Sequence, residues 1–237
     1  MIEAAEKLLH PDVECDKRFD RLAIYSQLLG LPERRYPRDF AEFSAHVFLP
    51  GDLVTSMGDM VMESEKAYKE KEQIIDWDRS SQKYIPGIPT TGNDHFVPVP
   101  KEQWDSIYFG KKALFEYHVH PRVHFFNAHG ILFSPDDMAL FYSYPRYSYI
   151  HAVMTSCGGS FVFQTQRASK LPFSSEYRYR HIRRMIKDPD VDFLVHGHRW
   201  KQLGYGLYLW FPKEVIENRN PMSEGISLTR YDLVRYR

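Results

Sequence analysis

The sequence predicts a single α/β domain with a central mixed β-sheet flanked by helices. Short apolar runs typical of strands alternate with segments whose apolar residues recur at helical spacing. The chain has 237 residues, which is long enough to bury one substantial hydrophobic core. We therefore expect one main domain with added segments.

The N-terminal part is expected to form two short helices, over residues 3–9 and 17–29, the second ending at Gly30. We interpret residues 1–42 as a helical extension and residues 43–237 as the main domain with a C-terminal extension.

The main domain is expected to begin with a strand over residues 45–49 and an amphipathic helix that starts after Pro50. Residues 73–77 follow as a strand, residues 86–92 as a loop, and residues 95–99 as a short edge strand confined by its prolines. Further strands are expected over residues 113–120, 149–154, 160–164, 205–210 and 226–234, and helices from Pro135 and over residues 174–187.

Two closely spaced histidines, His118 and His120, end the strand over residues 113–120. Alternate residues of a strand point to the same face, so both imidazoles can reach one ion. Asp137 would lie in the first turn of the next helix and could add a carboxylate. Two imidazoles and one carboxylate leave the fourth zinc position open to water, as in catalytic zinc sites.

The stretch from Ser134 to Asp137 also has an explanation without metal. Ser134 is a good N-cap, Pro135 suits the first helical position, and an acidic side chain favours the first turn. The serine and the aspartate would then serve only to begin a helix.

The pattern His118-x-His120 followed by Ser134-x-x-Asp137 resembles the JAMM zinc metalloproteases of the JAB/MPN family. The resemblance covers roughly residues 45–166, and the thirteen residues 121–133 between the two halves suggest a loop insertion. It implies an MPN core, which is cytidine-deaminase-like, with Zn²⁺ bound by His118, His120 and Asp137. It further implies an isopeptidase that acts on ubiquitin or ubiquitin-like conjugates.

In such an enzyme the zinc lowers the pKa of its bound water and polarises the scissile carbonyl. Ser134 would donate a hydrogen bond to the developing oxyanion. A glutamate that is not a zinc ligand would carry the proton. We favour Glu72, because it immediately precedes the apolar residues of the strand over 73–77, although the chain lacks the E-x-x-G setting that is common in the family. The other candidates are Glu70, Glu63 and Glu65.

Other histidines and arginines have simpler explanations. We interpret His196 and His198 as part of a turn after residue 195, and His124 and His129 as solvated loop residues that could approach the zinc. The arginines of the helix over residues 174–187 favour a solvated face, and less a docking patch.

Composition narrows the function classes. The 31 basic residues balance 31 acidic ones, which disfavours a nucleic-acid-binding module and an anionic membrane surface. Two cysteines and no signal peptide or long apolar run favour a soluble cytoplasmic or nuclear protein. A non-catalytic MPN-type scaffold subunit of a larger assembly is the alternative function, because the long spacer and the unplaced glutamate also fit that role.

Overall fold

A curled mixed β-sheet organises the fold of the computed structural model, which describes residues 20–93, 113–121, 131–143, 148–170, 180, 193–212, 220 and 222–234. Within these residues the sheet has nine strands in the order β1-β9-β8-β7-β6-β5-β2-β3, with β4 also paired to β2. The strands are β1 (His46–Leu49), β2 (Lys71–Asp78), β3 (Lys83–Pro86), β4 (Thr90–Thr91), β5 (Ala113–Val119), β6 (Ser148–Thr155), β7 (Gly158–Gln164), β8 (Tyr205–Trp210) and β9 (Ile226–Arg230). Strands β5 and β6 run parallel, and the other pairs are antiparallel.

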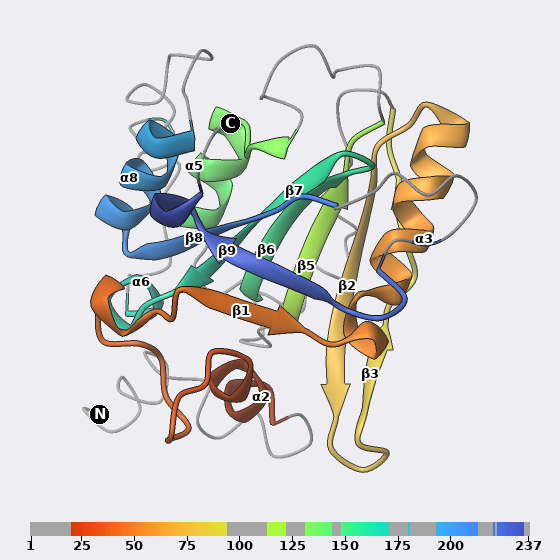
Figure 1. Ribbon diagram of the computed structural model, residues 1–237. Helices are drawn as coiled ribbons and strands as arrows, with labels where there is room; N and C mark the ends of the chain where they lie inside the picture. The colour runs from red at the N-terminus through yellow and green to blue at the C-terminus, as the bar shows by residue number, and fades with distance from the viewer. Residues whose placement is uncertain are drawn as a thin grey trace, which may run out of the picture.

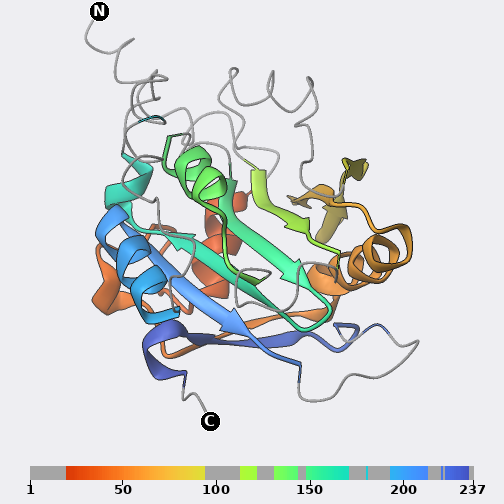
Figure 2. The same cartoon turned by 90° about the horizontal axis from the view of Figure 1, so that it is seen from above.

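The helices of the described residues lie around this sheet (Figures 1 and 2). They are α2 (Arg21–Leu28), α3 (Gly51–Ala67), α5 (Pro135–Ser143), α6 (Gln166–Ser169) and α8 (Phe193–Leu203), with 3-10 turns η1 (Phe40–Glu42) and η4 (Tyr231–Leu233). The predicted α/β class with a mixed sheet flanked by helices is confirmed. The assignment to the MPN fold stays a proposal.

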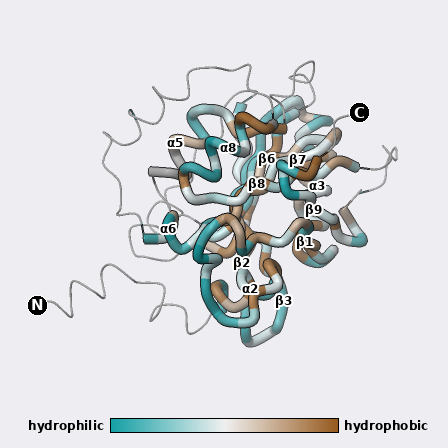
Figure 3. Tube along the Cα trace, turned by 60° about the vertical axis from the view of Figure 1, so that its left-hand side comes forward, coloured by the Kyte–Doolittle hydropathy of each residue, from teal (hydrophilic) through white to brown (hydrophobic). Residues whose placement is uncertain are grey.

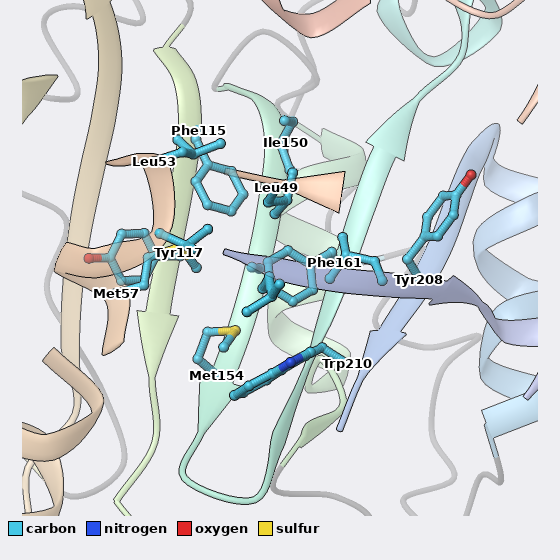
Figure 4. Packing of buried hydrophobic residues seen from close by; sticks show 14 of the residues in the cluster. Leu49, Leu53, Met57, Phe115, Tyr117, Ile150, Met154, Phe161, Tyr208 and Trp210 are labelled. Carbon is cyan, nitrogen blue, oxygen red and sulfur yellow. The ribbon is translucent and has the colours of Figure 1, made fainter. Parts of the chain in front are cut away.

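The curl of the sheet encloses the larger of two hydrophobic clusters. Strands β1 and β9 cross in front of β5, β6 and β7 in Figure 1, so that the sheet forms a half-barrel. Leu49 of β1, Phe115 of β5 and Phe161 of β7 meet inside it, and all three are fully buried (Figure 4). Leu53 and Met57 of α3 pack into the same cluster.

Helix α3 forms because apolar residues recur on one side of it. It begins after Pro50 and ends where Tyr68 takes a left-handed conformation with φ of 52°. At Gly58 an added Cβ atom would lie 1.9 Å from Asn220 Oδ1. Asn220 donates hydrogen bonds to Thr55 O and Asp59 Oδ1, both at 2.8 Å, which ties the segment before β9 to this helix.

The opposite face of the sheet carries a second cluster beneath α5 and α8. Phe133, Phe141 and Trp200 pack there against Val153 and Val162 of β6 and β7. The hydropathy colours of Figure 3 show brown stretches near β6 and β7, whereas α6 is hydrophilic. Phe115, Tyr117 and Val119 of β5 point into the first cluster. Because successive side chains of a strand alternate between its faces, His118 points to the second face.

Helix α2 packs directly on the sheet. Tyr25 is fully buried, and its hydroxyl donates a hydrogen bond to Gln164 O. The Arg21 guanidinium binds both oxygens of Asp76 at 2.6 and 2.9 Å, and Asp76 also accepts the Leu114 N–H. Helix α2 therefore shares the hydrophobic core of the main domain. The division of the chain at residue 42 stays a prediction.

Three predicted elements differ from the structure. Residues 193–203 form helix α8, where we expected a turn, because this segment packs against the distant Tyr231 ring through Gly197. The loop over residues 86–92 contains strand β4, which pairs with β2. The last strand ends at Arg230 and continues as η4, where Tyr231 is buried beside α8.

Several predicted elements lie outside the described residues. These are the helix over 3–9, the edge strand over 95–99, the helix over 174–187 apart from Arg180, and the loop histidines His124 and His129. Among the helices that are described, none is long and apolar enough to cross a membrane.

Candidate metal centre

Strand β5 brings His118 and His120 to one face, as predicted. His118 lies within β5 and is 7% exposed. His120 follows the strand directly, and its N–H donates a 2.9 Å hydrogen bond to Met154 O of β6, so the ladder continues through it. The two imidazole ring centroids are 4.9 Å apart. The histidine pair is therefore a local cluster at the carboxyl end of a central strand.

Asp137 is fixed in the first turn of α5 by a reciprocal cap. Its backbone N–H donates to Ser134 Oγ at 3.1 Å, and the Ser134 N–H donates to Asp137 Oδ2 at 2.8 Å. These two bonds form a capping box, which satisfies donors at the start of the helix. They also aim the carboxylate at β5, where Oδ2 lies 3.6 Å from His118 Nε2. The helix cap therefore also places the Asp137 carboxylate beside His118.

The contact between His118 and Asp137 is electrostatic. A separation of 3.6 Å suits an ion pair and exceeds hydrogen-bond length. Burial alone would lower the pKa of His118, but the nearby negative charges, that of Asp137 foremost, together outweigh burial and raise the pKa to about 9. Burial raises the pKa of Asp137, and the charge of His118 outweighs that effect and holds it well below the usual range.

His118 Nε2 is a buried polar atom that makes no hydrogen bond in the structure. Its partner in the ion pair, Asp137 Oδ2, lies beyond hydrogen-bond length, and an ion bound between the two atoms would satisfy both. Ligand atoms about 2 Å from a tetrahedral zinc stand roughly 3.3 Å apart. The 3.6 Å between His118 Nε2 and Asp137 Oδ2 is close to that separation.

The complete triad is not yet at metal-binding distances. Among the described residues, no three His, Cys, Asp or Glu side chains stand close enough together to hold a metal ion as they are. His118 and Asp137 have suitable spacing, and the His120 ring would need to turn toward them. The donor set, two imidazoles and a carboxylate, fits zinc in chemistry.

Two buried glutamates lie next to the histidine pair on strand β2. Glu72 is the cross-strand partner of His118, so their side chains share a face. Glu70 directly precedes β2, and its Oε1 lies 3.8 Å from His120 Nε2. Lys71, between them, points to the opposite face and pairs with Glu63 of α3. Glu65 also belongs to α3, so the two glutamates at the start of β2 are the ones beside the pair.

The second histidine pair does not form a shared site. His196 and His198 lie two residues apart on α8 and therefore point to different sides of the helix. His196 accepts the Trp200 hydrogen bond, and His198 Nδ1 is 3.3 Å from the Tyr231 hydroxyl. Both imidazoles are explained by packing around α8.

Sequence reasoning missed a third acid–histidine pair. Glu116 Oε2 lies 2.8 Å from His151 Nδ1, and both residues are buried. Glu116 precedes His118 by two residues, so the polar alternation 116–118–120 within an apolar strand was the available signal. His151 gave no comparable signal, because it lies inside the apolar run of β6.

Comparisons with protein-family models, with curated proteins and with solved structures returned no match. The function proposed below therefore depends on the geometry of these side chains and on the resemblance of the motif.

Proposed function

We propose that this protein is a zinc-dependent isopeptidase of the JAMM type with a cytidine-deaminase-like MPN core. His118, His120 and Asp137 would hold the Zn²⁺. The observation that carries the proposal is the buried His118 Nε2, which has no hydrogen-bond partner and lies 3.6 Å from Asp137 Oδ2 with the His120 ring beside it. Two imidazoles and a carboxylate are ligands of the kinds that zinc prefers.

Zinc bound there would supply Lewis acidity, which activates water and polarises a carbonyl. The protein's own groups would handle protons and orientation. Ser134 Oγ accepts the Asp137 N–H, so its own hydroxyl proton can be donated to an oxyanion. A water oxygen would add to the carbonyl carbon, the amide C–N bond would break, and the products would be a carboxylate and an amine.

We assign the proton transfer to Glu72. It lies on the ligand face directly across from His118, and it is 6% exposed. Its carboxylate would take a proton from the attacking water and deliver it to the leaving nitrogen. Glu70 is the second candidate, since its carboxylate lies near His120, and a carboxylate in that position could also serve as a ligand.

The substrate class follows from the resemblance to JAMM enzymes, which implies ubiquitin or a ubiquitin-like conjugate. The chemistry of the site requires only an amide bond that can reach the face shared by β2 and β5.

The first experiment measures zinc by elemental analysis after purification without chelator. We expect about one zinc per chain. The double variant His118→Ala with His120→Ala should lose the metal. His196→Ala with His198→Ala is the matched control, because it removes two imidazoles from α8 and should leave the zinc in place. Wild-type protein that neither carries nor takes up zinc would refute the proposal.

The second experiment separates binding from catalysis with linked ubiquitin chains and a chelator control. Glu72→Gln should abolish cleavage while zinc stays bound, since it removes a proton carrier and no ligand. Glu70→Gln is the matched variant on the same face. Retained cleavage in Glu72→Gln together with loss in Glu70→Gln would move the role to Glu70.

A non-catalytic MPN-type scaffold is the second candidate function. One observation favours it, namely that no three ligand-type side chains of the described part of the chain stand at metal-binding spacing. A scaffold would bind partner subunits and would cleave no conjugate. Zinc-loaded wild-type protein that leaves every tested conjugate intact would support this role over the enzyme.

A further inference from the structure

A buried acid–histidine pair lies beside the candidate centre and has no role in the chemistry above. Glu116 of β5 and His151 of β6 are direct partners across the parallel strands. They are 2% and 0% exposed. Burying such groups carries a large desolvation penalty, and apolar residues of similar volume are often at least as stable in such places. A contribution to folding stability therefore does not explain why Glu116 and His151 are buried here.

The pair connects the two elements that carry the candidate ligands. Glu116 shares a strand face with His118, two residues further along β5. On the other side, the His151 ring stacks on Phe141, with centroids 3.8 Å apart and planes at 23°. Phe141 lies four residues after Asp137, on the same side of α5.

The His151 ring is also held from its own strand. Ser148 Oγ lies 3.0 Å from His151 Nδ1 and 3.3 Å from Nε2. Ser148 is itself fixed, because its hydroxyl donates to Ile150 O at 2.7 Å and its carbonyl accepts the Gln164 side chain at 2.8 Å. The imidazole therefore has a defined orientation between strand β5 and helix α5.

We propose that Glu116, His151 and Phe141 form a positioning bridge that sets the separation between His118 and Asp137. Glu116 of β5 contacts His151, and His151 stacks on Phe141 of α5, so this chain of contacts joins β5 to α5. The same strand and helix carry His118 and Asp137, which lie 3.6 Å apart. The identity of the ion in that gap rests on the proposed function. The separation itself does not.

The test compares Glu116→Leu with Glu116→Gln. Leucine fills the site but removes the contact to His151, whereas glutamine keeps a hydrogen-bonding group of the same length. Crystal structures of the metal-free variants give the distance from His118 Nε2 to Asp137 Oδ2, and competition with a chromophoric chelator gives the zinc affinity. We expect Glu116→Leu to lengthen the distance and to weaken zinc binding about tenfold or more. Glu116→Gln should restore most of both.

A matched core variant separates positioning from loss of stability. Leu207→Ala removes buried volume from the same cluster on β8, where Val162 of β7 separates Leu207 from His151. It should lower the thermal midpoint and leave zinc affinity unchanged. His151→Phe is the second bridge variant if Glu116→Leu does not fold, because phenylalanine keeps the stack on Phe141 and loses the acid contact.

The outcomes distinguish the bridge from the proposed function. An unchanged distance in the bridge variants overturns the bridge, whether or not zinc binds. Equal loss of zinc affinity in Leu207→Ala also overturns it, because the effect would then be one of general stability. If wild-type protein binds no zinc but Glu116→Leu lengthens the distance, the bridge stands and the zinc proposal fails.

Discussion

The metal-free protein is expected to become less stable as the pH rises from about 6.5 to 9, because of His118. Its ordinary pKa is 6.5, and in the fold the pKa rises to about 9 since the Asp137 charge outweighs the effect of burial. The folded state therefore binds a proton more tightly at this site than the unfolded chain does. Stability from this group is fully present below pH 6.5 and is lost as the pH rises through 9.

The size of the effect follows from the same pKa values. Each pKa unit corresponds to about 1.4 kcal/mol, so the difference between 6.5 and about 9 corresponds to roughly 3–4 kcal/mol of unfolding free energy. Asp137 has a lowered pKa, so its contribution is present above its ordinary value of 3.8 and is lost as the pH falls. Both effects come from one ion pair and are not added together.

Urea unfolding in the presence of a chelator, followed by tryptophan fluorescence between about pH 6 and pH 9, measures this loss. The control is Asp137→Asn, because an asparagine oxygen can still accept the Ser134 N–H that caps α5 while the charge is gone. Most of the dependence on pH in this range should disappear in the variant. Equal slopes in the wild-type protein and in Asp137→Asn would refute the assignment to this ion pair.

The remaining predictions concern packing and the helix cap. Gly58→Ala should lower the unfolding free energy by roughly 1–3 kcal/mol, because the new Cβ would lie 1.9 Å from Asn220 Oδ1; thermal unfolding should show part of the loss restored when Asn220→Ala is added. Ser134→Ala should lower stability by about 1 kcal/mol through loss of the cap and, if the protein is an isopeptidase, lower turnover about a hundredfold. Asp136→Ala, in the same turn but outside the two cap bonds, should leave turnover within about twofold of wild type and so serves as control.

Local patterns in the sequence were sufficient for much of the fold. The apolar run over residues 205–210 matches β8, and Pro135 begins α5, because each depends on residues close together in the chain. The curl of the sheet was not predictable in this way, since it brings residues that are far apart in sequence, such as Leu49 and Phe161, into one hydrophobic cluster. Helix α8 was mistaken for a turn for the same reason, as Gly197 packs against the distant Tyr231 ring.

In the candidate site, too, the features that depend on neighbouring residues were predictable and those that depend on strand pairing were not. The pairing of His118 with His120 follows from the alternation of a strand, and the capping bonds of Ser134 follow from helix chemistry. The choice of glutamate does not follow, because Glu70 and Glu72 alternate onto one face and the sequence alone cannot say which is nearer the ligands. Only the pairing of β2 with β5 excludes the glutamates of α3 from that face.

The topology also explains why the long spacer does not separate the two halves of the motif. Strands β5 and β6 are parallel, so the chain leaves β5 at one end of the sheet and must return to the other end through α5. The first turn of α5 therefore lies near the carboxyl end of β5, where His120 is. The thirteen residues between His120 and Ser134 can lengthen the connection without changing which ends meet, since doubling a loop adds only about 0.6 kcal/mol of closure entropy. We expect a shortened spacer to preserve the 3.6 Å contact between His118 and Asp137, because the crossover brings the two ends together and the proposed bridge sets their separation.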